Sequence, residues 1–298
     1  MNKNSVLKIE ILGTCGLISV KDKEIYTYLK TSFQPFLSNF TDSKAHFQVE
    51  IAKEKAKTFN SIIPKYPQAL DMVSVRNDQK KIFLELVEYD VILEVIDLVK
   101  HQSQIYIDTK GKLLPILISL IRASFDVFCI SRGIVFLHAC GVIDGTVGYL
   151  FIGDSGAGKT TISNLLSNLL LLSDDCVGVG QINENYCISG TPWNKSVNQN
   201  SAIHCLFFPR RAKNGTKLEF EEIKPLYAVE KLISNIPAVT ATLPFVQKRL
   251  DFASNLVRHL PCYYMYFSPT TDLWKGIRRF MEETFSASFY NTKSNCTG

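Results

Sequence analysis

The chain has 298 residues, of which 46% are hydrophobic and 20% charged, so it is long enough for two modest domains with separate cores. Its formal net charge of +5 is small for this length, and it carries neither a basic block nor a ladder of aromatic residues, which argues against nucleic acid as a partner. The eight cysteines form no C-x-x-C pair. This pattern is typical of reduced, buried thiols in a cytoplasmic protein and not of a disulfide framework or a zinc site.

No targeting or membrane segment is expected. The first residues lead directly into a strand-like run at 6–11, without the continuous apolar region of a signal peptide. The most apolar stretch, residues 113–130, is interrupted by Pro115, Arg122 and Asp126, so a buried helix fits it better than a span across a bilayer. We therefore expect a cytoplasmic protein without a membrane partner.

Residues 1–110 are predicted to form a β-rich α+β domain. Apolar runs separated by turn-forming residues predict strands at 6–11, 47–51, 72–75, 82–86, 91–95 and 104–107. Nothing in this region has catalytic spacing, so we assign it to binding a substrate or a partner. Residues 111–132 are predicted to be a connecting helix, 133–285 a catalytic domain, and 286–298 a flexible tail.

The most informative segment is the run from Phe151 to Thr161, which fits the phosphate-binding pattern G-x-x-x-x-G-K-[ST] at every fixed position. A strand predicted at 148–152 and a helix predicted at 160–170 supply the strand, loop and helix that the pattern requires. A Gly-rich turn without function is the alternative. The pattern favours a protein that binds a nucleoside triphosphate.

Each residue type in this loop has a chemical reason. The glycines let backbone amides turn toward the phosphates, Lys159 places a cation on the β and γ oxygens, and the Thr160 hydroxyl can bind Mg²⁺. The sequence therefore predicts ATP and Mg²⁺ as cofactors. The residues expected to contact the nucleotide are Gly153, Asp154, Ser155, Gly156, Ala157, Gly158, Lys159, Thr160 and Thr161.

Two carboxylates follow soon after the loop. The apolar run 169–172 predicts a short buried strand that ends in Ser173, Asp174 and Asp175. Adjacent residues at a strand end point in different directions, so one carboxylate can hold Mg²⁺ while the other accepts a proton from an attacking hydroxyl. Which aspartate has which role stays open, and a simple strand cap is the alternative.

These features together resemble the catalytic core of HPr kinase/phosphorylase and its relatives. The likeness covers residues 136–177 closely, through a His before the loop and an Asp-Asp pair after it, and extends more loosely to about residue 280. It implies an α/β fold with a P-loop kinase core similar to the nucleotide domain of phosphoenolpyruvate carboxykinase. It also implies ATP-dependent phosphorylation of a serine hydroxyl on a peptide or protein. Lys159 and Thr160 would contact phosphate and Mg²⁺, Asp174 and Asp175 would supply the base and a metal ligand, and His138 would lie beside them.

The chain also departs from that family. Familiar members end the loop in Gly-Lys-Ser-Glu, whereas this chain has Thr160 and Thr161, and the family's second signature, with its Arg for the phosphorolytic reaction, is not found. HPr itself is therefore not the expected substrate. The chain is more similar to divergent relatives such as the lasso-peptide kinases, which phosphorylate a precursor peptide. Family members form hexamers, and no feature of this sequence fixes whether the chain forms a homo-oligomer.

His138 closes the apolar run 134–137, where a strand is expected to end. A His in apolar company is more often a hydrogen-bonded core residue, but the family resemblance favours a place in the site. A hairpin through Asp144 and Gly145 would bring His138 back alongside the phosphate loop. There it could hydrogen-bond one carboxylate and tune its basicity.

Several elements are predicted downstream. Strands at 203–208 and 216–223 are expected to form a hairpin around Asn214-Gly215, with Arg210 and Arg211 in the connection, either solvated or in contact with phosphate. Trp193 could stack on adenine, close over a substrate peptide or pack in the core. The remaining elements are a strand near 186, helices at 225–236 and 244–260, a strand at 262–267 and a last helix capped by Thr271.

Three classes of function fit this sequence. The first is a kinase that acts on Ser or Thr of a peptide or small protein, because the set of His138, Lys159, Asp174 and Asp175 supplies a base as well as a metal site. The second is a P-loop ATPase or nucleotide-switched binding protein. The third is a small-molecule kinase or a carboxykinase-like enzyme. The sequence does not distinguish ATP from GTP.

Overall fold

The computed structural model describes residues 5–38, 45–53, 69–70, 73–77, 80–86, 92–107, 114–193, 196–212, 218–237, 245–269 and 272–285. The chain divides into two compact units. The first comprises Met1–Arg132 with Ala238–Val246, and the second comprises Gly133–Pro237 with Gln247–Gly298. In the described part of the chain, no helix is both long and apolar enough to cross a membrane.

The first unit is built on an eight-stranded sheet in the order β1-β2-β3-β8-β7-β6-β5-β4. Its neighbouring strands are antiparallel except for the parallel pairs β2–β3 and β3–β8. The strands are β1 Ser5–Ile11, β2 Thr14–Val20, β3 Phe47–Lys53, β4 Ala69–Leu70, β5 Val73–Asn77, β6 Lys81–Leu86, β7 Ile92–Asp97 and β8 Gln102–Ile107. The helices are α1 Lys23–Ser32, the short 3-10 helix η1 Gln34–Phe36, and α2 Leu114–Ile130.

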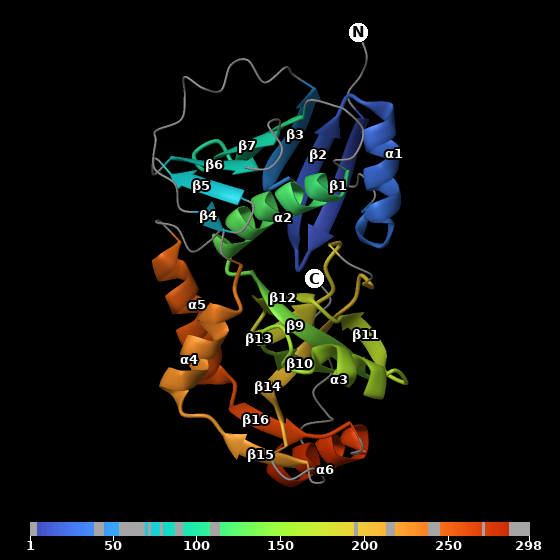
Figure 1. Cartoon of the computed structure of the whole chain (residues 1–298), viewed down its shortest axis with the longest axis vertical. Helices are drawn as coiled ribbons and strands as arrows, with labels where there is room; N and C mark the ends of the chain where they lie inside the picture. The colour runs from blue at the N-terminus through green and yellow to red at the C-terminus, as the bar shows by residue number, and fades with distance from the viewer. Residues whose placement is uncertain are drawn as a thin grey trace. The chain divides into compact units, whose positions relative to one another are not determined.

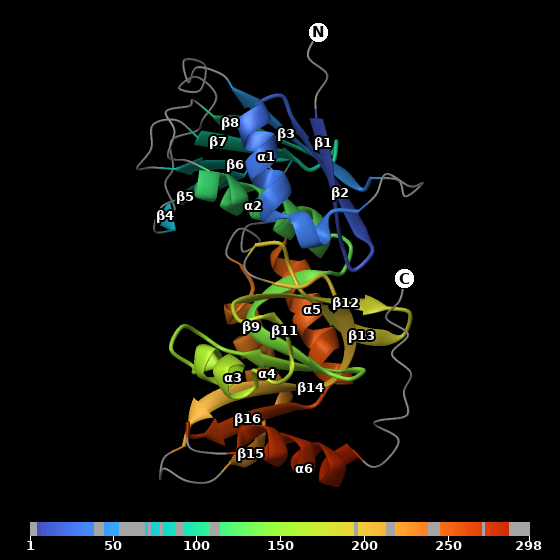
Figure 2. The ribbon, with the colours of Figure 1, turned by 90° about the vertical axis from the view of Figure 1, so that its right-hand side faces the viewer.

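Helices α1 and α2 cover one face of this sheet (Figures 1 and 2). Along β3, Phe47, Val49 and Ile51 are buried, as expected for a strand with one covered face. The Phe47 ring meets the Phe125 ring of α2 edge-on, with the centroids 4.7 Å apart. The aromatic contact fixes α2 against the sheet.

The sheet also lines a cavity of about 330 Å³. Most of the residues around this cavity are polar, among them Gln48.

Among the described residues of the first unit, two acidic side chains are buried. The Glu94 carboxylate on β7 accepts a hydrogen bond from Ser103 Oγ at 2.6 Å and another from the Ser124 hydroxyl of α2. Burial raises the pKa of Glu94 to about 8 and that of Asp126 to about 7, because the charged form loses its hydration. Arg122 lies 3.9 Å from the Asp126 carboxylate and partly opposes the shift at that residue.

The second unit contains another eight-stranded sheet, in the order β10-β9-β12-β13-β14-β16-β15, with β11 paired to β9. Because β10 also pairs with β14, the path from β10 through β9, β12 and β13 to β14 closes on itself. The pairs β10–β14 and β14–β16 are parallel. The strands are β9 Val135–Asp144, β10 Val147–Ile152, β11 Leu170–Ser173, β12 Cys176–Ile182, β13 Asn185–Ser189, β14 Asn200–Arg211, β15 Glu219–Glu222 and β16 Cys262–Phe267.

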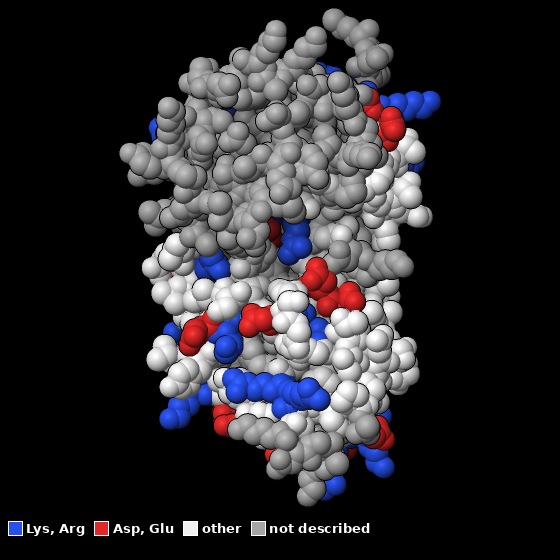
Figure 3. Space-filling view, in the orientation of Figure 1, with Lys and Arg blue, Asp and Glu red and all other residues white. Residues whose placement is uncertain are grey.

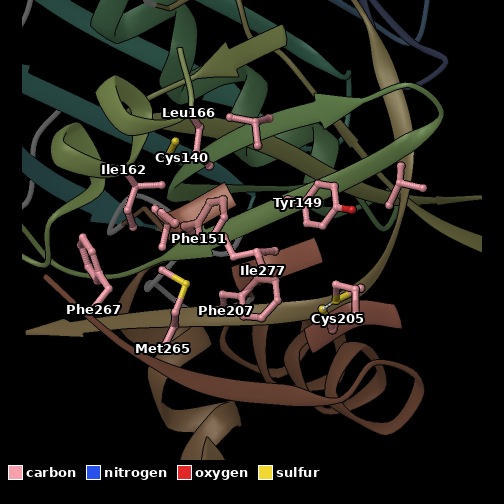
Figure 4. Close-up of a cluster of buried hydrophobic side chains, with 14 residues drawn as sticks. Cys140, Tyr149, Phe151, Ile162, Leu166, Cys205, Phe207, Met265, Phe267 and Ile277 are labelled. Atoms are coloured by element: carbon pink, nitrogen blue, oxygen red, sulfur yellow. Dashed lines mark hydrogen bonds between the residues drawn. The ribbon is translucent and has the colours of Figure 1, made fainter. Parts of the chain in front are cut away.

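A hydrophobic cluster fills the space between this sheet and two helices, α3 Lys159–Leu165 and α6 Leu273–Phe285 (Figure 4). At its centre the rings of Phe151 on β10 and Phe207 on β14 stack with centroids 5.5 Å apart. Ile162 of α3 and Ile277 of α6 are fully buried against them. The cluster therefore holds the strand before the phosphate loop and the helix after it in one rigid core.

Two further helices, α4 Pro225–Ser234 and α5 Val246–His259, are tied together by a buried arginine. The Arg249 guanidinium of α5 donates to the carbonyl of Ile233 at 2.7 Å and to that of Ile236 at 3.2 Å. Ile233 lies in the last turn of α4 and Ile236 just beyond the helix, and the Ile233 carbonyl also accepts a hydrogen bond from the Ile236 amide at 3.2 Å. Arg249 thus caps α4 from the neighbouring helix.

Most of the predicted strands and helices are confirmed, and the fold is mixed α/β. The predicted hairpin between 203–208 and 216–223 is wrong, because β16 lies between β14 and β15 in the sheet. The helix predicted at 160–170 is too long, since α3 ends at Leu165. Strands β2 and β12 and helix α1 have no counterpart among the predicted elements. The predicted tail 286–298, Thr271 and the turn at 213–215 lie outside the described residues.

The predicted free thiols are confirmed for six cysteines. Cys15, Cys129, Cys140, Cys176, Cys205 and Cys262 are free and buried. Cys187 is disulfide-bonded, so the prediction of reduced cysteines throughout is wrong at that position.

Candidate active site

The phosphate-loop motif connects β10 to α3. Gly156 and Gly158 have φ angles of 85° and 97°, in the left-handed region that glycine adopts without strain. A Cβ atom at Gly158 would approach Phe267 Cζ to 2.9 Å, so a larger residue there would push the loop off β16. The backbone of the loop therefore needs glycine at position 158 for both its conformation and its packing.

Lys159 begins α3 and turns back over the loop. Its Nζ donates to the carbonyl oxygens of Gly153 at 2.6 Å and Asp154 at 3.0 Å, and the residue is only 6% exposed. Burial lowers the pKa of Lys159, and the nearby carboxylates of Asp175 and Asp154 oppose this shift. The ammonium group is thus partly desolvated and held by neutral oxygens, an arrangement in which an anion would be a stronger partner.

The remaining loop residues lie at or near the surface. Ser155 and Thr160 are exposed, and Ala157 and Thr161 are half-buried. The Ala157 amide donates to the Asp154 carbonyl at 3.1 Å, which closes a tight turn. The first amides of an α-helix have no partner within the helix, so those at the start of α3 are available to a ligand of the loop.

Asp174 and Asp175 form the two-residue connection between β11 and β12. Both are half-buried. The pKa of the buried Cys140 thiol is raised to about 12, mainly by burial and then by the charge of Asp174, whereas Lys159 opposes the shift. Asp174, Asp175, Cys140 and Lys159 are therefore close enough to interact electrostatically. Cys140 has no counterpart among the predicted site residues, because one apolar residue in a buried strand carries no chemical pattern.

His138 contacts the second of these aspartates. Its Nε2 lies 3.2 Å from Asp175 Oδ1, and the two side chains are 38% and 47% exposed. The contact follows from strand pairing, since His138 is opposite Cys176 in the β9–β12 ladder and the Ala139 amide donates to the Asp175 carbonyl at 3.1 Å. The prediction that His138 ends its strand is wrong, because β9 continues to Asp144.

The hairpin between β9 and β10 brings the loop to the same place. Ala139 is paired with Ile152, so His138 stands beside the point where the chain leaves β10 for the phosphate loop. The turn passes through Gly145, whose φ angle of 59° is again left-handed. Three separate segments of the chain, β9, the loop and the β11–β12 connection, thus meet at one site.

The predicted donors for Mg²⁺ are one hydroxyl, that of Thr160, and the carboxylates of Asp174 and Asp175. Within the described ranges, no group of three or more His, Cys, Asp or Glu side chains is arranged to hold a metal ion. Oxygen donors of this kind suit Mg²⁺, which keeps several waters and phosphate oxygens among its ligands. A Mg²⁺ ion held by these side chains would therefore need most of its ligands from water and phosphate.

Two other predicted features occupy different places. Trp193 is 8% exposed and meets Phe136 edge-on at a centroid distance of 6.1 Å, so it packs in the core. Arg210 and Arg211 end strand β14, and the Arg210 guanidinium lies 3.6 Å from the centroid of the Tyr264 ring. Acidic and basic side chains lie near one another on the face of the second unit seen in Figure 3. In the described part of that face, positive and negative side chains are therefore mixed, and the face as a whole does not carry one sign of charge.

Comparison with known proteins finds a distant likeness among solved structures and none elsewhere. No family model matches the chain, and no curated protein matches it. Among solved structures, the chain is similar to the Hpr(Ser) kinase/phosphatase from Coxiella burnetii, with 13% sequence identity and a TM-score of 0.27. The match covers 53% of this chain and 98% of that one. Because the likeness is so weak, the function is inferred from the chain's own residues.

Proposed function

We propose that this chain is an ATP-dependent kinase that transfers a phosphoryl group to a serine or threonine hydroxyl of a peptide or small protein in the cytoplasm. One observation carries the proposal: the His138–Asp175 pair lies beside a phosphate-loop motif that contains Lys159. A nucleotide loop alone would fit any P-loop protein. A carboxylate held beside that loop favours a reaction in which an acceptor hydroxyl must lose its proton.

The loop would bind the triphosphate. Lys159 is held by the carbonyls of Gly153 and Asp154, and the γ-phosphate oxygens would replace these neutral partners with charged ones. Thr160 and Asp174 would hold Mg²⁺, which supplies charge neutralisation on the phosphate oxygens when it is bound. We assign the metal to Asp174 because Asp175 is already engaged by His138.

Asp175 would then act as the base. Its carboxylate takes the proton from the acceptor hydroxyl while the hydroxyl oxygen forms a bond to the γ-phosphorus. The bond from that phosphorus to the bridging oxygen breaks, and its electron pair leaves with ADP. His138, 3.2 Å from Asp175 Oδ1, orients the carboxylate and does not itself contact the substrates. The similarity of the motifs to peptide-modifying relatives favours a precursor peptide as the acceptor.

A labelling experiment tests this function. The purified chain is incubated with Mg²⁺, ATP labelled at the γ-phosphate, and a pool of peptides that contain serine and threonine. A second pool with alanine at those positions is the control, and the Lys159→Ala variant is the control for the enzyme. We expect label in the first pool only, with none transferred by the variant. Parallel reactions with GTP determine the nucleotide preference.

Other outcomes would overturn the proposal in favour of a different class. Rapid ATP hydrolysis that is equal with both pools, without labelled peptide, would indicate an ATPase or a nucleotide-switched binding protein. Label that appears only on added small hydroxyl compounds would indicate a small-molecule kinase. The absence of any nucleotide binding would contradict all three classes of function.

A further inference from the structure

Three hydroxyl groups surround the connection that carries Asp174 and Asp175. The first is that of Ser173, which is fully buried at the end of β11. Its Oγ accepts a hydrogen bond from the Asp175 amide at 3.3 Å and from the Cys176 amide at 3.2 Å. A serine that bonds the backbone two and three residues ahead fixes a tight turn. The aspartates are therefore held in place from within their own segment.

The other two hydroxyls come from the segment that follows β13. Thr191 is fully buried, and its Oγ1 donates to the carbonyl of Cys176, just after the pair, at 2.9 Å. Ser196 Oγ hydrogen-bonds the carbonyl of Leu172, just before the pair. The Thr191 amide in turn donates to Ser196 Oγ at 3.1 Å, which links the two hydroxyls. One segment thus binds the backbone on both sides of Asp174 and Asp175.

A bulge explains why Leu172 needs such a partner. In the pairing of β11 with β9, Leu171 is opposite Val142 and Ser173 is opposite Gly141, so the register shifts at Leu172. The extra residue of a bulge is left out of the ladder, and its backbone groups must find other partners. The Ser196 hydroxyl supplies one for the Leu172 carbonyl. The bulge also turns the strand end that presents the aspartates.

We propose that Ser173, Thr191 and Ser196 form a hydroxyl clamp that positions the two carboxylates for phosphoryl transfer. The three are positioning residues, because they act on the backbone of the pair and not on a substrate. The proposal rests on the proposed kinase function for its effect on rate. A displacement of about 1 Å in a catalytic group can lower a rate by about a hundredfold. Hydrogen bonds to the backbone on both sides of the pair would prevent such a displacement of the two carboxylates.

The test compares Thr191→Val with Thr191→Ser and with a matched control. Ser201→Ala is the control, because Ser201 is also buried and its Oγ also donates to a backbone carbonyl, that of Thr146 at 2.7 Å. Thr146 belongs to the turn between β9 and β10, away from the aspartates. We expect Thr191→Val to lower kcat by about tenfold or more with little change in the affinity for ATP, since the phosphate loop is untouched. Thr191→Ser should restore most of the rate, and Ser201→Ala should stay near the wild-type rate.

A second measurement does not depend on activity. Hydrogen exchange of the peptide that contains Asp175 and Cys176 is measured by mass spectrometry for each variant below its melting temperature. We expect faster exchange in Thr191→Val and in the less buried Ser196→Ala, but not in Ser201→Ala. Equal exchange in all variants, or a loss of rate in Ser201→Ala as large as in Thr191→Val, would overturn the clamp. If the wild type transfers no phosphate but the exchange pattern holds, the kinase function fails and the clamp survives as a structural device.

If Thr191→Val does not fold, Ser196→Ala carries the same test. Ser196 is half-buried, and its removal frees the Leu172 carbonyl at the bulge while leaving the Thr191 hydroxyl in place. The expected pattern is the same loss of kcat with ATP affinity retained. A variant that keeps the full rate and the wild-type exchange would overturn the clamp.

Discussion

His138 on β9 and Asp175 before β12 lie on neighbouring antiparallel strands, with Nε2 of the imidazole 3.2 Å from Oδ1 of the carboxylate. The backbone reinforces the contact, since the amide of the next residue, Ala139, donates to the Asp175 carbonyl. Both side chains remain partly open to solvent. The pair is therefore fixed in place and still accessible from solvent.

Replacing His138 should separate chemistry from nucleotide binding. We expect His138→Ala to lower phosphoryl transfer by about tenfold or more, because a carboxylate without its orienting partner spends less time in the productive geometry. The affinity for ATP should change little, because the phosphate loop does not need the imidazole. Nucleotide affinity and peptide phosphorylation are measured in parallel. Equal losses in both, or a loss of folded protein alone, would assign His138 to a structural role.

The two aspartates should fail in different ways. Asp174→Asn and Asp175→Asn are each expected to lower transfer by at least about a hundredfold. For Asp174→Asn, a higher Mg²⁺ concentration should recover part of the rate, because the variant weakens metal binding. For Asp175→Asn it should not, because the amide is no base. Rates measured across a Mg²⁺ titration distinguish the two, and the assignment is reversed if Asp175→Asn is the variant that Mg²⁺ rescues.

Gly158 should tolerate no side chain. Gly158→Ala places a methyl group only 2.9 Å from Phe267 Cζ, at a φ angle of 97°, and should greatly weaken ATP binding. Gly145→Ala is the matched control, because Gly145 also has a left-handed φ angle but has open space at its Cβ position. That variant should lose some stability and keep its affinity for ATP. Calorimetric titration of both variants with ATP checks this, and normal binding by Gly158→Ala would mean that the loop is not the nucleotide site.

The first unit should become less stable as the pH rises. Burial raises the pKa of Glu94 from an ordinary value of 4.5 to about 8, so the folded unit keeps a proton that the unfolded chain releases. The stability that depends on this proton is fully present below about pH 4.5 and is lost as the pH rises toward 8. Glu94→Gln, which stays neutral, should reduce the difference between melting temperatures at pH 5 and pH 8. An unchanged difference would show that Glu94 is not the titrating group, and Asp126→Asn is then the variant to measure.

Local patterns predicted much of the site. The spacing of Gly153, Gly158 and Lys159 is set within one loop, and the aspartates follow a short strand, so neighbouring residues carry the information. The approach of His138 to the loop depends only on a hairpin through Asp144 and Gly145, which short-range turn chemistry favours. The burial of Lys159 was not evident, because it depends on packing of the loop against β9 and β16.

Long-range pairing was beyond these patterns. The residues before and after Asn214-Gly215 favour a local hairpin, but the parallel partner of β14 is β16, which enters after α4 and α5. Its Met265 and Phe267 complete the cluster around Phe207, so burial outweighs the local turn preference. Thr191 and Ser196 likewise bond carbonyls 15 and 24 residues away, and such contacts leave no periodic pattern in a sequence.

Binding of ATP to the loop is the central claim, and Lys159 tests it most directly. Mg²⁺ and ATP are titrated calorimetrically into the wild-type chain and into Lys159→Ala, after circular dichroism has shown that both are folded. We predict saturable binding by the wild type and an affinity at least about tenfold weaker in the variant, with no phosphoryl transfer, because the cation that faces the β and γ phosphates is gone. Equal affinity in the two proteins, or no binding by the wild type, would contradict the assignment of the loop as the nucleotide site.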